Sequence, residues 1–285
     1  MSLLKPRSWM RRSRLALLGG LFVAVLMALA FMPRIPIGPH YHDFADKRTL
    51  WGTPNALDVF SNIPFVLVGV WGLVWLFPRS SSRSFVDQRE RIPWVIFFAG
   101  VTLTGFGSYW YHLAPSNARL PWDLLPMTCS FLSIVAATYM ERIDLKSGLA
   151  ALFPLLLLGI ASVTYWYLTA ADHHGDYKFY LLVQFFSPVL LALMIGLFPP
   201  RYSGTRYLVI AFGLYVLAKL FETYDYPIFN SGHIVSGHAL KHVTAAISCG
   251  FILRMLQVRR PMVSDPMAGD RAEAGAAKNL TYSQQ

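Results

Sequence analysis

Charged residues are scarce in this sequence. They make up 14% of its 285 residues, whereas soluble domains carry about 25%. Hydrophobic residues reach 55% and are concentrated in long runs that are separated by short basic loops. The sequence therefore predicts a polytopic membrane protein and argues against an ordinary soluble domain.

Acidic residues are also few, with 15 Asp and Glu against 25 Lys and Arg, and the formal net charge is +10. An excess of positive charge can indicate a protein that binds nucleic acid. Here, however, the basic residues lie in the loops between apolar runs, where membrane proteins place their topology signals. We therefore expect no nucleic-acid partner, and we expect the lipid bilayer to surround the chain.

Cysteine is nearly absent. The only two, Cys129 and Cys249, each lie inside an apolar run. We interpret both as small hydrophobic residues, which argues against a disulfide framework and against a cysteine-based metal site. An internal repeat or a low-complexity segment that would mark a second domain is also missing.

Eight apolar runs are long enough to form membrane helices, so we predict an all-α, polytopic membrane helix bundle. The first run follows a basic start, as in a signal peptide, but it exceeds the roughly 7–15 apolar residues of such a peptide and shows no clear cleavage site. We therefore predict a retained first helix. The runs cover residues 15–32, 56–77, 93–112, 122–141, 148–170, 178–198, 207–222 and 236–257.

The loop charges predict the orientation. Basic loops alternate with the other loops, and the basic N-terminus falls on the same side as the basic loops. By the positive-inside rule, both termini are cytoplasmic, as expected in a bacterial inner membrane. The loops that then face the outer, periplasmic side are 34–55, 113–121, 171–177 and 223–235. The chain divides into a basic N-terminus (1–14), an extra transmembrane helix (15–32), a seven-helix domain (33–257) and a disordered cytoplasmic tail (258–285).

Two histidines open the last apolar run. His238 and His242 are four residues apart, so on a helix they share one face and can bind one metal ion. The alternative is a pair of interfacial histidines that bond to water or to lipid headgroups. Ionisable side chains inside a membrane segment are functional candidates by default.

Three further polar residues fall at the same predicted depth. Ser108 and His112 end the third run, and Asp123 begins the fourth. Taken singly, Ser108 could bond to its own helix, Asp123 could cap the fourth helix and His112 could belong to an aromatic belt. Together with the histidine pair, His112 completes a set of three histidines that suffices to hold a catalytic zinc. Asp123 can then serve as the base and Ser108 as an oxyanion donor.

The combined spacing resembles that of the alkaline ceramidases, which belong to a broader superfamily of seven-helix hydrolases that includes the adiponectin-receptor type. The resemblance covers about residues 43–254 and includes the segment from Trp51 to Asn62, where a Ser-Asn pair recurs. It implies a seven-helix fold and hydrolysis of the N-acyl amide of a ceramide-like lipid to a fatty acid and a sphingoid-type amine. It implies that zinc is held by His112, His238 and His242, with Ser108 and Asp123 around the metal-bound water.

The same resemblance implies a calcium site before the first family helix. The matching residues are Asp43, Asp46 and Asn55, whose oxygens suit a hard cation. Arg48 departs from the pattern because it offers no ligand atom, and Asn55 is a weaker ligand than a carboxylate. The alternative is a solvated loop in which Asp46 pairs with Lys47 or Arg48.

Other polar residues have simpler interpretations. Lys219 and Glu222 are three residues apart, so we expect a structural ion pair near the outer surface. His173, His174 and Asp176 are expected to be exposed loop residues. His233 precedes the last helix without a predicted role.

Several functional hypotheses remain open. The zinc site serves an amidase or an ester hydrolase equally well. A receptor-like, lipid-binding protein with a structural zinc would not need Asp123 and Ser108 beside the metal. A transporter usually shows internal repeats and broken-helix pairs, and neither is evident here. The lipid headgroup, the acyl chain and the oligomeric state are not encoded in any pattern that we recognise.

Overall fold

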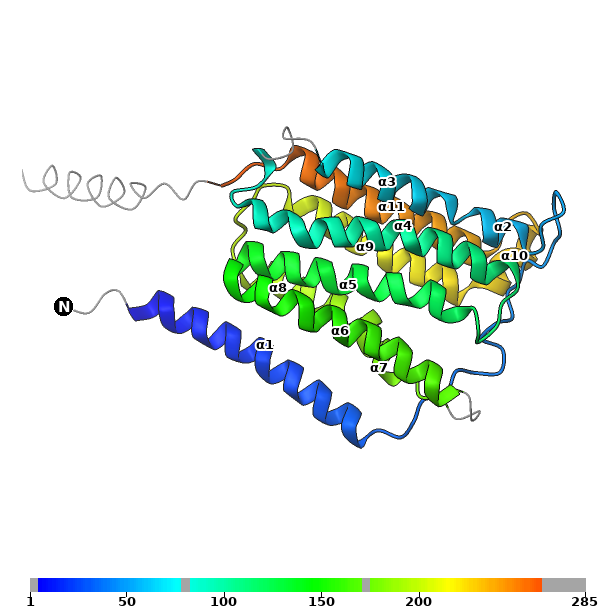
Figure 1. The fold of residues 1–285 in the computed structure, drawn as a ribbon, viewed down its shortest axis with the longest axis horizontal. Coiled ribbons are helices and arrows are strands. Elements are labelled where there is room, and N and C mark those ends of the chain that lie inside the picture. Colours follow the sequence, from blue (N-terminus) through cyan, green and yellow to red (C-terminus); the bar gives the residue numbers. More distant parts are fainter. Residues whose placement is uncertain (1–4, 78–82, 171–174, 263–285) are drawn as a thin grey trace, which may run out of the picture.

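The described residues, 5–77, 83–170 and 175–262 of a computed structural model, form a bundle of helices (Figure 1). Within these residues the only extended pairings are two isolated bridges, Leu50–Thr53 and Tyr202–Pro261. The predicted all-α class is therefore confirmed. The helices are α1 (Lys5–Phe31), α2 (Ala56–Phe60), α3 (Ile63–Leu76), η2 (Gln88–Glu90), α4 (Arg91–Leu113), α5 (Leu120–Arg142), α6 (Leu145–Ala170), α7 (Lys178–Leu181), η3 (Leu182–Phe186), α8 (Ser187–Leu197), α9 (Thr205–Thr223), α10 (Asp225–Gly232) and α11 (Gly237–Val258).

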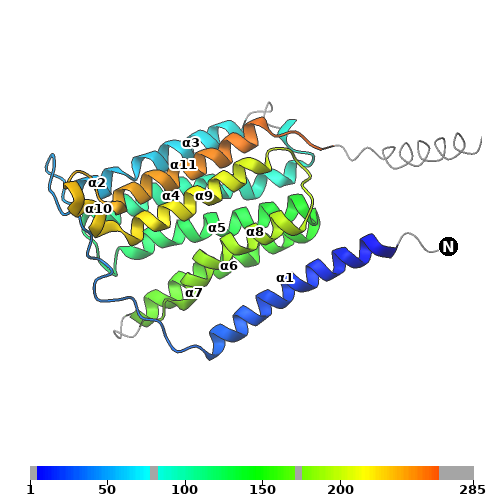
Figure 2. The same ribbon diagram turned by 180° about the vertical axis from the view of Figure 1, so that it is seen from behind.

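The bundle has the dimensions of a multi-pass membrane protein. Seven helical segments of the described chain are long and apolar enough to cross a membrane, and α9 with α10, bent by 70°, would make an eighth. The long helices run side by side between two ends of the molecule (Figures 1 and 2). The loops with many basic residues lie at one end and the loops predicted to face outward lie at the other. We call these the basic end and the histidine end.

Helix α1 lies apart from the other helices (Figure 2). Only 6% of its most apolar stretch is buried by the rest of the chain. Its contacts at the basic end include Arg11, which donates to the carbonyl of Ile143, and Arg14, which donates to the carbonyl of Leu197. Both acceptors lie at or just beyond the end of a helix, where carbonyls lack helical partners. The arginines of α1 thus fasten it to α5 and α8.

Three predicted segments differ from the structure. The run 56–77 is broken between α2 and α3, at Ser61 and Asn62. The loop 223–235 contains α10. The run 178–198 contains a π turn at 182–186, and the physical reason is Pro188: it has no N–H to donate to the carbonyl of Gln184, which instead accepts a hydrogen bond from the Tyr215 hydroxyl at 3.1 Å. The tail beyond residue 262 lies outside the described residues.

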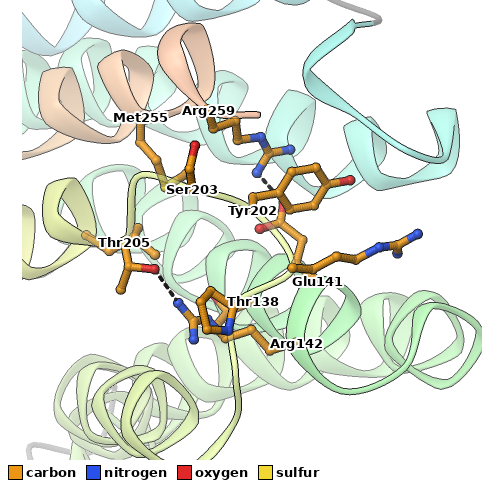
Figure 3. A pocket seen from close by; sticks show the side chains of 11 residues that line it. Thr138, Glu141, Arg142, Tyr202, Ser203, Thr205, Met255 and Arg259 are labelled. Atoms are coloured by element: carbon orange, nitrogen blue, oxygen red, sulfur yellow. Dashed lines mark hydrogen bonds and ion pairs between the residues drawn. The ribbon is translucent and has the colours of Figure 1, made fainter. Parts of the chain in front are cut away.

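The basic end is closed by ionic contacts. Arg259 is buried and donates to the Glu141 carboxylate (Figure 3). It also donates to the carbonyl of Ser84 and lies against three aromatic rings. Nearby, Arg142 donates to the carbonyl of Phe198 and to the Thr205 hydroxyl. The cavity between these groups is about 10 Å³, which is space for about one water molecule. The space between these groups is therefore too small for a lipid chain, whereas an open pocket of about 450 Å³ lies at the same end beside Trp75, Arg83 and Arg260.

Helices α4 and α5 approach each other most closely at Gly107. A Cβ atom at this position would lie 1.8 Å from the carbonyl oxygen of Trp122. No side chain fits in that space, so the glycine allows the two backbones to touch. The contact sets the first turn of α5 beside the last turns of α4, and these turns carry Asp123, Ser108 and His112.

We predict that Gly107→Ala destabilises the bundle, by about 1–3 kcal/mol as is typical of overpacking. The matched control is Gly213→Ala in α9, where a Cβ would meet no atom within 4 Å and where alanine favours the helix. Thermal unfolding of the two variants in the same detergent measures the effect. Equal unfolding midpoints for the two variants would contradict the proposed close approach.

Candidate metal centre

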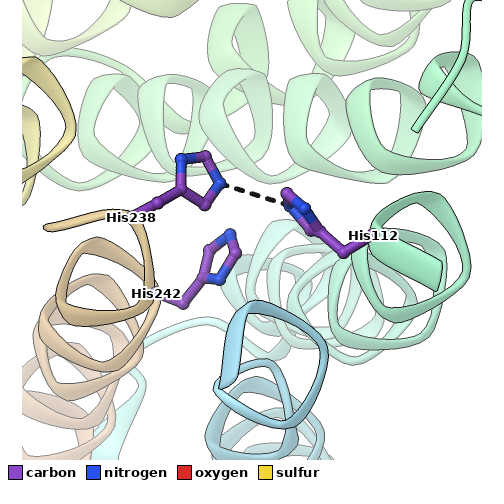
Figure 4. A group of neighbouring side chains, drawn as sticks. All are labelled: His112, His238 and His242. Atoms are coloured by element: carbon purple, nitrogen blue, oxygen red, sulfur yellow. Dashed lines mark hydrogen bonds between the residues drawn. The ribbon is translucent and has the colours of Figure 1, made fainter. Parts of the chain in front are cut away.

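Three buried histidines converge near the histidine end of the bundle. His112 projects from α4, and His238 and His242 project from α11 (Figure 4). One ring nitrogen of each lies within 4.8 Å of the others, and the Nε2 atoms of His112 and His238 are 3.2 Å apart. Within the described residues, this is the only group of three or more His, Cys, Asp or Glu side chains that could hold a metal ion.

The ring of His242 is oriented by a hydrogen bond to α2. Its Nδ1 atom lies 2.8 Å from the hydroxyl of Ser61, which itself donates to the carbonyl of Asp58 at 3.0 Å. Because the Ser61 proton is used in that bond, the hydroxyl accepts from His242, and the proton of the neutral imidazole is placed on Nδ1. Nε2 then keeps a lone pair for a metal ion, the arrangement that is usual for histidine ligands.

The N-terminus of α11, which carries both histidines, is held by carboxylates. The Ser236 hydroxyl caps the helix by accepting from the N–H of Ala239 at 2.9 Å, and it donates to Asp58 at 2.7 Å. Asp225 accepts from the backbone N–H of His238 at 2.7 Å. These bonds satisfy donors that a helix start leaves unpaired. They also fix the rotation of α11 about its axis, and hence the direction of its two imidazoles.

A loop residue covers the histidines from the outside. The Phe44 ring lies 4.7 Å from the ring of His112 and 4.3 Å from that of His238, between centroids. Phe44 is itself buried. The amide of Asn55 ties the same region to α4 by donating to the carbonyl of His112 at 2.9 Å. The segment before α2 therefore covers the imidazoles and separates them from bulk water.

Ser108 lies one helical turn before His112, and Asp123 lies within reach of Ser108. Both are buried, and Ser108 occupies the same face of α4 as His112, one turn earlier. The Ser108 hydroxyl has no hydrogen-bond partner of normal geometry, although it lies within interaction range of the Asp123 carboxylate. Asp123 is not the N-cap of α5, because that position belongs to Arg119, which makes no side-chain cap.

An ion network that the sequence only partly indicated also reaches the site. Lys219 and Glu222 form the predicted ion pair, but Glu222 also accepts from Lys241 at 3.0 Å. Lys241 lies one residue before His242, and its ammonium is 3.1 Å from Nε2 of His238. The network therefore connects α9 to the histidine cluster and is more than an isolated structural pair.

The residues of the predicted calcium site each have a partner in the protein. Asp43 pairs with Lys47, and Asp46 pairs with Arg48. Arg48 also donates to the carbonyls of His233 and Ile234. Burial alone would raise the pKa of Asp46, but the hydrogen bonds from Arg48 outweigh it and hold the pKa below its ordinary value. The hydrogen bond from Lys47 likewise lowers the pKa of Asp43.

The prediction of calcium binding is tested by stability. Calcium would have to take the Asp46 oxygens from Arg48, so Arg48→Asn should increase any stabilisation that calcium gives in thermal unfolding. Magnesium, which demands tighter octahedral geometry, is the control ion. An unfolding midpoint that excess calcium leaves unchanged in both the parent protein and the variant would contradict the calcium site.

The remaining predicted loop residues differ from one another. Asp176 was expected to be exposed, and this is wrong, because it is fully buried and pairs with Lys178 at 3.2 Å. Its carboxylate also accepts from the backbone N–H of Ile35, so it holds the chain that follows α1. His233 is exposed, in a left-handed conformation with φ of 53°. His173 and His174 lie outside the described residues.

Sequence reasoning missed the supporting residues of the centre. Charged residues are rare in or beside apolar runs. The positions of Asp58, Asp225 and Lys241 could therefore have marked them as functional candidates. The role of Phe44 carried no signal, because the segment before α2 has no periodicity from which its path over the histidines could be predicted.

Comparison with models of known protein families and with curated proteins found no match to this chain. The assignment therefore depends on the donor set itself. The three imidazoles are buried, their ring nitrogens face one another, and one ring is oriented by a neighbouring hydroxyl. These features fit a divalent metal ion that accepts nitrogen ligands.

We predict that purified protein binds about one equivalent of such a metal ion and that His238→Ala loses most of it. The matched control is His233→Ala, which removes an exposed histidine outside the cluster. Metal content by elemental analysis after dialysis gives the result. Full metal content in His238→Ala would contradict the ligand set.

Proposed function

We propose that this protein is an integral-membrane, zinc-dependent amidase that hydrolyses the N-acyl amide of a ceramide-like lipid to a fatty acid and a sphingoid-type amine. The observation that carries this proposal is the convergence of three buried histidines in a membrane helix bundle, with buried Ser108 one turn before His112 and buried Asp123 within reach of Ser108. A purely structural metal would need neither group. The resemblance of the spacing to alkaline ceramidases supports the same activity.

The chain supplies each part that amide hydrolysis needs. His112, His238 and His242 would hold the zinc ion, which would act as a Lewis acid and lower the pKa of a bound water to about 7. In the proposed reaction, the Asp123 carboxylate would accept a proton from the attacking water and pass it to the leaving amine. The Ser108 hydroxyl, which makes no hydrogen bond of normal geometry within the protein, would donate to the oxygen of the attacked carbonyl.

Access to the site favours a lipid substrate. Phe44 covers the histidines from outside, and the three imidazoles are themselves nearly fully buried. A substrate with long acyl chains can instead enter between helices from the bilayer. We infer that the histidine end faces the periplasm of a bacterial inner membrane, with both termini cytoplasmic. A water-consuming reaction near the membrane surface fits that placement.

A zinc-dependent ester or other acyl hydrolase in lipid remodelling is the second candidate. The same residues would carry that reaction, because an ester carbonyl is attacked and stabilised in the same way. A screen of purified protein against N-acylated and O-acylated lipids, each with and without chelator, separates the two. Binding of lipid without turnover would instead favour the receptor-like alternative.

We predict that Asp123→Asn lowers the turnover rate by about 10²–10⁴-fold, the usual range for loss of a positioned acid or base. The metal content should stay at the level of the parent protein, because Asp123 is not a ligand in this assignment. The measurements are release of fatty acid from ceramide in mixed micelles and elemental analysis of the same sample.

The matched control for that substitution is Asp144→Asn, which removes a carboxylate at the basic end, where Asp144 caps α6 through Ser147. Its activity should stay within a small factor of the parent protein. Full activity in Asp123→Asn, or loss of the metal from it, would show that the role assigned to Asp123 is wrong.

A further inference from the structure

We propose that Lys219 and Lys241 bind an anionic group of the lipid, such as a phosphate or a carboxylate on its headgroup, next to the bond that is cleaved. This inference rests on the proposed function and specifies its substrate class. The observation behind it is that two ammonium groups meet a single carboxylate, Glu222, beside the histidine cluster.

The charges of this network do not balance. A structural ion pair needs one cation and one anion, whereas here Glu222 contacts both Lys219 and Lys241. The direct ion pairs therefore leave one more cation than anion. The Asp123 carboxylate acts on Lys241 only from beyond ion-pair distance, so the second ammonium lacks a carboxylate of its own in a helix bundle, where an incompletely paired charge is costly. An anionic group from the substrate would supply the missing compensation.

The network is also more accessible than the histidines. The side chains of Lys219, Glu222 and Lys241 are 25%, 31% and 19% exposed, whereas the imidazoles are nearly fully buried. Lys241 reaches both Glu222 and His238. The network thus extends from the cluster to a more open surface, which is the position that a headgroup would occupy while the amide lies at the histidines.

The donor capacity of the network suits an anion. Each ammonium has three donors, and the acceptor that the structure shows for Lys219 is Glu222. The Lys219 ammonium also lies over the Phe185 ring at 5.3 Å from its centroid, which positions it between α9 and the π turn. Lysine is a common binder of phosphate as a point charge, and a neutral headgroup would gain hydrogen bonds from the ammonium groups but no charge compensation.

The first test compares kcat/KM for ceramide and phosphorylated ceramide with the same acyl chain. The parent protein should prefer the phosphorylated lipid, and Lys219→Met should reduce the ratio of the two values by about tenfold, equivalent to about 1.4 kcal/mol. Lys219→Arg should keep much of the preference, and Lys146→Met at the basic end is the matched control. A preference for neutral ceramide, or an equal ratio in Lys219→Met and the parent protein, would overturn the inference.

The second test needs no turnover. Binding of dodecyl phosphate, with dodecanoate as the carboxylate arm, is measured by calorimetry in neutral detergent micelles with the Asp123→Asn protein and with the Asp123→Asn, Lys219→Met double variant. Tighter binding of either anion in the single variant supports the anion site even if no lipid is hydrolysed, and the tighter of the two identifies the preferred group. Equal binding in the two variants overturns the anion site whether or not amide hydrolysis is found.

Discussion

The convergence of three imidazoles from two helices is the constraint on which the histidine end depends. Neutral histidines are costly to bury without partners, so their rings must be held by the surrounding helices. Gly107 allows α5 to touch α4, Ser61 orients the ring of His242 and Asp225 holds the start of α11. Each of these contacts lies within a few residues of a histidine or of Asp123, so the packing of this end and the geometry of the cluster cannot be varied separately.

The two ends of the bundle use charge differently. At the basic end, Arg259 and Glu141 are matched one to one and are enclosed by aromatic rings, which is the pattern of a stabilising contact. At the histidine end, Glu222 meets two lysines, and Asp123 has no ion-pair partner among the described residues. Unmatched charge inside a membrane protein is costly, and charged residues of this kind are typical of sites where a ligand or a reaction uses them.

Much of the candidate centre could be predicted from the sequence, because it depends on helical spacing and membrane depth. The spacing of His238 and His242 places them on one face, and the alternation of basic loops brings Ser108, His112 and Asp123 to the same end. The first argument uses the periodicity of the helix backbone, and the second uses the placement of basic loops on one side of a membrane. The structure brings His112, His238 and His242 together. Ser108 lies one turn before His112 on α4, and Asp123 lies within reach of Ser108.

The remaining features depend on contacts between residues far apart in the chain. The break at Ser61 and Asn62, the turn of α10 and the path of Phe44 over the imidazoles are set by tertiary packing, and no local pattern encodes them. Lys241 shows the difference most clearly. Its position between two candidate ligands was visible in the sequence, but on an ideal helix it lies about 300° around the axis from His238, which places it near the edge of the histidine face. The structure adds that Glu222 on α9 accepts a hydrogen bond from Lys241. This contact holds the Lys241 ammonium next to His238 and away from the lipid. In the proposed function, a charge held next to the candidate metal centre would allow the site to distinguish lipids by headgroup as well as by amide.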